Sequence, residues 1–227
     1  MSPWNPTLEN EGNSNLDFIR SSLSSKTWFG FDLDDTLHEF RRASAHASSA
    51  TAGAFADGRT SIENPRERFS LLLHGRGLET STERLDRLLE TYERNLKGTL
   101  TLKPGSLRLL QRIKSLGKIV IVVTEGPQDA QQWTVEELGL LPYIDVLVTT
   151  NEIGISKVDR LFPIVLRKYS IPASKIVYVG DNEKRDVVPA RGAGILAVLY
   201  DEKGGCGFDD TAAFRVDSLE KLEYLLG

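Results

Sequence analysis

Two aspartates, Asp32 and Asp34, lie two residues apart directly after an aromatic, apolar stretch of the chain. The stretch Trp28–Phe31 suits a buried strand. Side chains at a strand end alternate between faces, so both carboxylates can reach one site while Leu33 points into the core. Two carboxylates about 4 Å apart repel by roughly 4 kcal/mol at an effective dielectric near 20. Because a metal ion or a shared proton offsets such repulsion, the pair predicts a metal site or an acid–base site.

Three more groups of reactive side chains follow predicted strands or begin predicted helices. Thr124 comes directly after the β-branched run 119–123, where a hydroxyl and the N–H groups of a helix start can hold a phosphate oxygen. Lys157 lies at a predicted helix start, although the helix dipole disfavours a cation there. Asp181 and Asp186 follow another apolar strand. Taken singly, these residues are ordinary turn residues, helix caps or solvated charges.

In this order and in these strand-to-helix contexts, the four groups resemble the motifs of the haloacid dehalogenase-like (HAD) hydrolases. The residues that carry the resemblance are Asp32-Leu33-Asp34-Asp35-Thr36, Thr124, Lys157 and Gly180-Asp181-Asn182-Glu183-Lys184-Arg185-Asp186. The resemblance extends from about Trp28 to Tyr200. It departs from the family pattern at Val158, where many relatives have proline after the lysine.

The resemblance implies a Mg²⁺ cofactor at the acidic residues. The carboxylates of Asp32 and Asp181 and the backbone carbonyl of Asp34 would bind the ion, together with substrate phosphate and water. Asp186 would be an outer ligand, acting through water or by orienting the lysine. We expect the three carboxylates of Asp32, Asp34 and Asp181 to converge, with Asp186 behind them.

The resemblance also implies a division of labour in phosphoryl transfer. Asp32 would attack phosphorus and form an aspartyl-phosphate, and Asp34 would protonate the leaving oxygen and then activate water. Thr124, Glu125 and Lys157 would bind the phosphoryl group, and Lys157 would stabilise its charge in the transition state. True haloacid dehalogenases lack an acid at the position of Asp34, because a carbon–halogen bond needs no leaving-group proton. The presence of Asp34 therefore indicates a phosphatase.

The elements that must position these residues alternate between strands and helices, which predicts an α/β fold with a parallel sheet flanked by helices. The resemblance implies that this core is Rossmann-like. Ligands bind beyond the carboxyl ends of the strands in such sheets, and the residues described above follow those ends. The predicted core comprises residues 26–37 and 98–227, and residues 1–25 are predicted to be a poorly ordered lead-in.

Residues 38–97 lack strand signals and carry apolar side chains at helical spacing, so we expect an all-helical cap domain inserted after the first strand. Its interior is expected to contain Leu85, Leu88, Leu89 and Tyr92. The two crossings between cap and core should be adjacent in space, which would form a hinge. A cap of this type usually accompanies small soluble substrates.

Composition narrows the class of protein and its compartment. The chain has 227 residues and a formal net charge of −4, with 40% hydrophobic and 26% charged residues, as in an ordinary globular protein. The mild acidity argues against nucleic acid as the main partner. The single cysteine, Cys206, excludes an internal disulfide and fits a reducing cytosol. Neither a membrane-spanning run nor a signal-peptide core is apparent, so we expect a cytoplasmic enzyme with a small phosphorylated metabolite as its partner.

Three alternatives are compatible with part of this pattern. A phosphomutase of the same family would keep the same residues and exclude water better. A non-catalytic relative would bind phosphate without turnover. A receiver-type signalling domain also places acids, a threonine and a lysine around Mg²⁺, but it would be much shorter and lack the helical insert. Glu125, Gly126 and the run 131–133 loosely resemble the nucleotidase-like branch, so nucleotides or sugar phosphates are the expected substrates.

Overall fold

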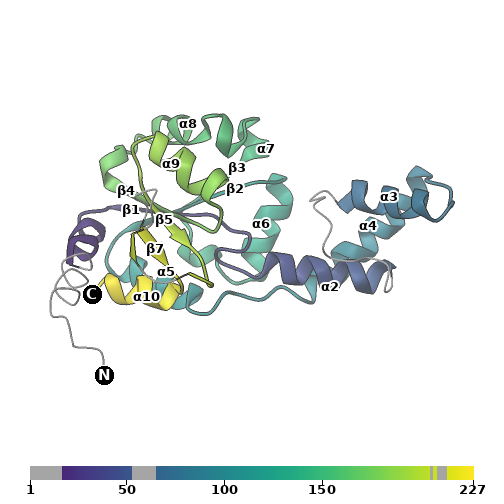
Figure 1. Ribbon diagram of the computed structural model, residues 1–227, viewed down its shortest axis with the longest axis horizontal. Coiled ribbons are helices and arrows are strands. Elements are labelled where there is room, and N and C mark those ends of the chain that lie inside the picture. The colour runs from purple at the N-terminus through teal and green to yellow at the C-terminus, as the bar shows by residue number, and fades with distance from the viewer. Residues whose placement is uncertain (1–16, 53–64, 205–206, 209–213) are drawn as a thin grey trace, which may run out of the picture. The chain divides into compact units, whose positions relative to one another are not determined.

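The computed structural model describes residues 17–52, 65–204, 207–208 and 214–227 (Figure 1). The described residues divide into two compact units. One unit contains the described residues up to Leu37 and from Leu102 onwards, and the other is His38–Thr101.

The predicted lead-in is only partly described. Residues 1–16 lie outside the described part of the chain. Residues 17–24 are helical, and the side chains of Ile19 and Leu23 are fully buried in the core of the first unit. The prediction of poor order is therefore wrong for this stretch, because two apolar residues four positions apart share one helix face and pack against the core.

The first unit is built on one sheet, and the predicted α/β fold is confirmed. The strand order is β3-β2-β1-β4-β5-β7-β6, and all neighbouring pairs are parallel except β6 with β7. The strands are β1 (Trp28–Phe31), β2 (Ile119–Thr124), β3 (Val146–Thr149), β4 (Ile176–Gly180), β5 (Leu196–Tyr200), β6 (Gly207–Phe208) and β7 (Phe214–Val216).

Helices lie on both faces of this sheet, with α8 and α9 on one face and α5 and α10 on the other (Figure 1). Ser218 caps α10, since its side chain accepts a hydrogen bond from the Lys221 N–H. The helices of this unit are α5 (Ser106–Ser115), α6 (Gln128–Glu137), α7 (Thr150–Ile153), α8 (Leu161–Lys168), α9 (Val188–Gly192) and α10 (Leu219–Leu225). A π-helical turn, Glu183–Val187, precedes α9.

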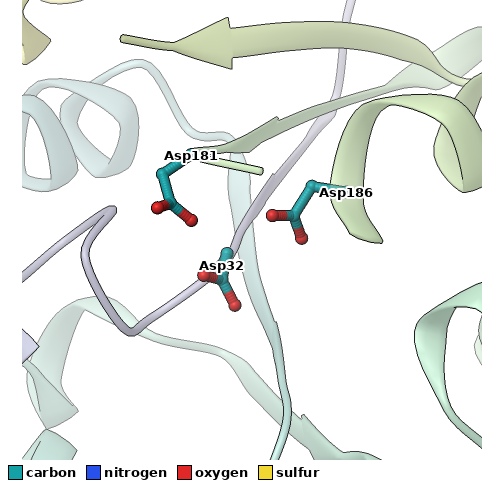
Figure 2. A group of neighbouring side chains, drawn as sticks. All are labelled: Asp32, Asp181 and Asp186. Carbon is teal, nitrogen blue, oxygen red and sulfur yellow. The ribbon is translucent and has the colours of Figure 1, made fainter. Parts of the chain in front are cut away.

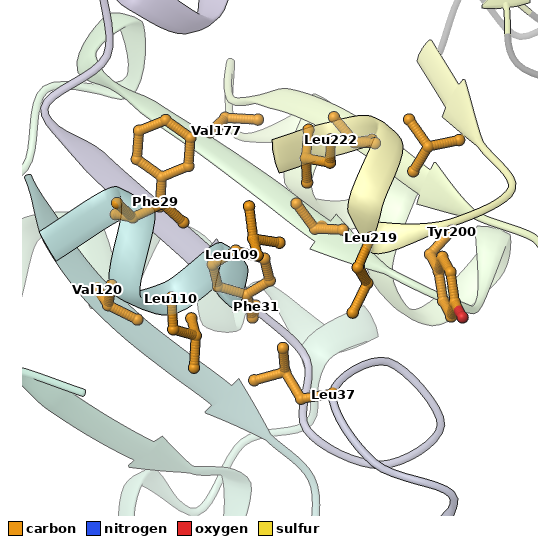
Figure 3. Packing of buried hydrophobic residues seen from close by; sticks show 14 of the residues in the cluster. Phe29, Phe31, Leu37, Leu109, Leu110, Val120, Val177, Tyr200, Leu219 and Leu222 are labelled. Carbon is orange, nitrogen blue, oxygen red and sulfur yellow. The ribbon is translucent and has the colours of Figure 1, made fainter. Parts of the chain in front are cut away.

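The central strands are buried on both faces, as their β-branched sequences predict. In β2, Val120 and Val122 contribute to the cluster that also contains residues of α5 and α10, which Figure 3 shows from close by. Ile121 and Val123 contribute to the second cluster, with α8 residues. The sheet is thus fixed between two apolar layers, and the polar residues that follow its strands are held at its edge.

One predicted helix is divided in the structure. The apolar spacing after Lys157 predicts a single helix over 157–169, but a 3₁₀ turn covers Lys157–Asp159 and α8 begins only at Leu161. Arg160, between the two, has a φ of +71°. The physical reason is Pro163, which has no N–H and whose ring clashes with the carbonyl four residues earlier in a continuous helix. In α8 it occupies the first turn, where proline is tolerated.

The second unit is helical and has an apolar cluster of its own. Leu85 and Tyr92 are buried as predicted, whereas Leu88 and Leu89 are only partly buried. The helices are α2 (Phe40–Ala52), α3 (Pro65–Gly75) and α4 (Thr82–Lys97). The cluster consists of Ala47, Phe69, Leu73, Leu85 and Tyr92, with partly buried leucines around it.

The two crossing segments lie side by side, as expected. The Glu39 N–H donates to the Thr101 carbonyl over 2.9 Å, and the Lys103 N–H donates to the Leu37 carbonyl over 3.0 Å. The insert therefore leaves and rejoins the chain at one place.

Candidate active site

Three carboxylates converge at the carboxyl ends of β1 and β4 (Figure 2). Asp32 follows β1, Asp181 follows β4, and Asp186 lies in the π-helical turn. One oxygen from each lies within 4.8 Å of the others. Asp32 is held at the sheet edge because its N–H continues the ladder to β4, donating to the Val179 carbonyl over 2.9 Å.

The group differs in one member from the expected set of three. The carboxylate of Asp34 does not belong to it, and Asp186 takes that place. The reason is local: Asp35 has a φ of +62°, so the chain turns sharply directly after Asp34, whose side chain is half-buried. Asp34 is still close enough for its charge to raise the pKa of Asp32. This position suits an acid–base group better than a third carboxylate ligand.

Lys157 lies against two of the carboxylates. Its Nζ is 2.5 Å from Asp32 Oδ1 and 2.7 Å from Asp186 Oδ1, and the residue is 2% exposed. Burial acts to lower the pKa of Lys157, but the two carboxylates outweigh it and raise the pKa above its ordinary value. The lysine is therefore a fixed cation, and it lies in the 3₁₀ turn before α8 and not at the predicted helix start.

Both carboxylate oxygens of Asp186 accept hydrogen bonds from the protein. Its Oδ1 accepts from Lys157 and lies 3.2 Å from the Tyr178 hydroxyl, while Oδ2 accepts from the Asn182 N–H over 3.1 Å. Gly180 allows this approach, since a Cβ there would overlap with the Asp186 carboxylate. An acid with both oxygens engaged by protein donors suits the predicted outer role better than direct ligation.

Thr36 joins two of the acids. Its hydroxyl accepts from the Asp181 N–H over 3.0 Å and lies 3.5 Å from Asp32 Oδ2. The side chain is fully buried. The sequence includes Thr36 in the first motif but does not reveal this task, because the partner strand is 145 positions away.

The acidic group fits a divalent cation on chemical grounds. Burial raises the pKa of the Asp32 carboxyl, Lys157 opposes the shift, and Asp186 and Asp34 add to it. Lys157 is the cation that contacts Asp32 and Asp186 within this group. Carboxylate oxygens at this spacing are the hard ligands that Mg²⁺ or Ca²⁺ takes. A bound divalent ion would favour the ionised form of Asp32.

The residues after β2 form the second side of the candidate site. Thr124 is fully buried, and its hydroxyl donates to Gln131 Oε1 in α6 over 3.2 Å. Gly126 has a φ of +123°, and a Cβ there would lie 3.1 Å from Gln131 Nε2, so the turn closes around this glutamine. The carboxylate of Glu125 pairs with Arg185 at 3.3 Å. Any contact of Glu125 with phosphate would therefore come from its backbone N–H.

Two buried residues at the site escaped the sequence reasoning. Gln131 was noted only as part of a loose resemblance, and Tyr178 only as part of an apolar strand. A polar side chain at a buried position of an otherwise apolar element is the signal that could have found both.

Comparison with known proteins places these residues in a family context. Residues 27–194 match the family model described as haloacid dehalogenase-like hydrolase. The pyrimidine 5'-nucleotidase YjjG of Escherichia coli is 29% identical, over 88% of this chain and 97% of that protein. The glyceraldehyde 3-phosphate phosphatase of Methanocaldococcus jannaschii is 26% identical, over 85% and 93%.

Solved structures share the fold. The L-2-haloacid dehalogenase of Xanthobacter autotrophicus superimposes with a TM-score of 0.69 at 16% identity, covering 88% of this chain and 98% of that one.

Within the described ranges, no helix is both long enough and apolar enough to cross a membrane.

Proposed function

Because the chain belongs to the haloacid dehalogenase-like hydrolases and is an enzyme that hydrolyses phosphoesters, we propose that it is a Mg²⁺-dependent phosphatase of small phosphomonoesters. The observation that carries the proposal is the contact of Asp32 with Lys157 inside a group of three carboxylates. A buried carboxylate beside a fixed cation, at the edge of a parallel sheet, can attack a phosphorus atom whose oxygens the cation holds.

The proposed reaction has two steps. In the first, an Asp32 carboxylate oxygen forms a bond to phosphorus while the bond from phosphorus to the leaving oxygen breaks, and Asp34 gives that oxygen a proton. In the second, Asp34 takes a proton from water, the water oxygen bonds to phosphorus, and the bond to Asp32 breaks. Inorganic phosphate leaves and both acids return to their starting states.

Electrostatic positioning supplies most of the proposed catalysis. Lys157 would hold phosphoryl oxygens, and the Thr124 hydroxyl would do so by exchanging its hydrogen bond to Gln131 Oε1 for one to the phosphoryl group. Asp32, Asp181 and the Asp34 backbone carbonyl would hold Mg²⁺, which when bound offsets the charge of the phosphoryl group. Asp186 would keep Lys157 aimed at the same oxygens through its contact at 2.7 Å.

Asp34 supports phosphoester over carbon–halogen chemistry. The fold is shared with a dehalogenase, so the fold does not distinguish the two reactions. Alkoxide leaving groups need a proton and halide ions do not. A half-buried acid two residues after Asp32 can supply that proton.

Small soluble phosphate esters are the proposed substrate class. The two relatives are named for a pyrimidine nucleotide activity and for glyceraldehyde 3-phosphate, and both align over more than four-fifths of this chain. We include nucleotides and sugar phosphates in the class. The single cysteine supports a reducing, cytoplasmic location.

Hydrolysis of p-nitrophenyl phosphate tests the proposal. The protein should release p-nitrophenol with Mg²⁺ and stop in excess EDTA, and Mg²⁺ added back should restore the rate. A panel of nucleoside monophosphates, sugar phosphates and triose phosphates then ranks substrates by kcat/KM. Full activity in EDTA would contradict the metal assignment. Phosphate passed to a second hydroxyl of a sugar, without release to water, would favour the phosphomutase.

A further inference from the structure

Tyr178 reaches across the sheet at the candidate site. It lies on β4 and is 1% exposed. Its hydroxyl is 2.9 Å from the Val123 carbonyl on β2, although β1 lies between these two strands. The side chain therefore lies over β1 and joins β2, which ends at Thr124, to β4, which ends at Gly180 directly before Asp181.

Gly30 on β1 makes this crossing possible. Gly30 is the register partner of Tyr178 in the parallel pair β1 and β4. A Cβ at position 30 would lie 2.7 Å from Tyr178 Cδ2, closer than carbon atoms can approach. Phe162 packs against the same ring at a centroid distance of 4.7 Å in an edge-to-face arrangement. Glycine in a strand interior costs stability, and the close approach of this ring explains it here.

The Tyr178 hydroxyl lies between the two halves of the site. In addition to its contact with the Val123 carbonyl, the hydroxyl lies 3.2 Å from Asp186 Oδ1. This is the same oxygen that accepts a hydrogen bond from Lys157. The Lys157 Nζ is 5.7 Å from the centroid of the tyrosine ring, so the ring also faces the cation. Burial and the neighbouring carboxylates raise the pKa of Tyr178, which keeps the phenol protonated and able to donate.

We propose that Tyr178 is a positioning residue that holds the Asp186–Lys157 pair and the Thr124 strand end in one fixed geometry for phosphoryl transfer. The proposal rests on the proposed phosphatase function. The hydroxyl has one proton, which the Val123 carbonyl and Asp186 Oδ1 share as acceptors, and without the hydroxyl both acceptors lose this donor. Lys157 and Thr124 would then sample geometries in which they no longer contact the phosphoryl oxygens together.

Replacing Tyr178 with Phe tests this, because the ring keeps its packing against Gly30 and Phe162. We expect kcat for p-nitrophenyl phosphate to fall roughly tenfold, equal to about 1.4 kcal/mol, with little change in KM. Affinity for orthovanadate, which copies the geometry of the transferring phosphoryl group, should fall by a similar factor. Affinity for inorganic phosphate should change much less. A purely structural role would not separate these two ligands.

Tyr200→Phe is the matched control. Tyr200 lies on the neighbouring strand β5, is 4% exposed, and donates its hydroxyl to a carboxylate, Glu202, over 2.6 Å. It belongs to the apolar cluster on the opposite face of the sheet from Tyr178. Loss of its hydroxyl should leave kcat and vanadate affinity within about twofold of wild type.

Gly30→Ala provides a second route that keeps the hydroxyl. The added methyl group displaces the ring, so kcat should fall as in Tyr178→Phe, and the double variant should lose little more than either single variant. If the fold-losses in kcat of the two single variants multiplied in the double variant, Gly30 would not act through Tyr178. Two results in Tyr178→Phe would overturn the proposal: a wild-type kcat, or equal losses of affinity for phosphate and for vanadate. If Tyr178→Phe does not fold, the same two results in Gly30→Ala would overturn it. A wild-type protein without phosphatase activity would instead refute the proposed function, and the role of Tyr178 would fall with it.

Discussion

Replacing Lys157 with Met removes a buried charge and keeps most of the side-chain length. Lys157 is 2% exposed and lies within 2.7 Å of both Asp32 and Asp186. The variant leaves these two buried carboxylates without their cation. Two consequences follow, one for the reaction and one for the stability of the fold.

The expected magnitudes come from this geometry. Loss of one electrostatic stabiliser of the transition state lowers kcat by about 10²–10³-fold. Removal of one partner from a buried ion pair costs about 3–5 kcal/mol. In a chain of this length that corresponds to a fall in Tm of roughly 10 °C, measured in EDTA. Mg²⁺ should restore more of the Tm in the variant than in wild type, because the ion would replace part of the missing positive charge.

Lys168→Met is the matched control for this change. Lys168 pairs with Glu152 at 2.8 Å, but both side chains are about two-fifths exposed, so this ion pair contributes at most about 1 kcal/mol. The Lys168→Met variant should have the same activity as wild type. A second comparison adds Asp186→Asn to Lys157→Met, which removes one of the uncompensated carboxylates. The double variant should therefore melt at a higher temperature than Lys157→Met alone.

Thermal melts in EDTA and in Mg²⁺, together with steady-state kinetics, decide the outcome. If Lys157→Met melted at the wild-type temperature in EDTA, Lys157 would not be the charge that compensates the two carboxylates. If the variant changed KM and left kcat intact, Lys157 would bind substrate in general rather than the transition state.

Three further changes probe the remaining residues. Asp32→Asn should abolish turnover and leave no phosphate covalently bound to the protein, and a phosphoenzyme detected by mass spectrometry would rule out Asp32 as the nucleophile. Asp34→Asn should lower kcat by about 10²–10⁴-fold while Mg²⁺ affinity, measured by titration, stays near wild type; a lost metal site would make Asp34 a carboxylate ligand instead. Gln131→Leu should lower kcat/KM roughly tenfold by releasing the Thr124 hydroxyl, and Thr124→Val should cost less in that background than alone; independent effects would separate the two residues.

Much of the fold was readable from the sequence because the signals were local and repeated. The β-branched run of β2 predicted burial on both faces, and its five residues after Ile119 are all buried. The acids after β1 and β4 were predicted to meet because parallel strands present their carboxyl ends at one edge, and Asp32 and Asp181 do meet there.

Contacts between distant positions were not readable in the same way. The task of Thr36 depends on an N–H that comes 145 positions later, and local propensity carries no information about that pairing. The replacement of Asp34 by Asp186 in the convergent group depends on the positive φ of Asp35 and on a π-helical turn. Neither conformation has a reliable single-sequence signal, since aspartate adopts αL only occasionally and π-helical turns are rare.

The positions where local rules fail have a common explanation. A fully buried lysine opposes the usual exposure of charged side chains, a glycine inside a strand opposes strand propensity, and an aspartate with positive φ opposes the usual backbone preference. In this chain Lys157, Gly30 and Asp35 break these rules, and each lies within or beside the group that contains Asp32. Local conflicts persist when a site requires them and the surrounding core over-determines the conformation. Three such conflicts around one carboxylate therefore support the assignment of Asp32 as the reactive centre, independently of any resemblance to other proteins.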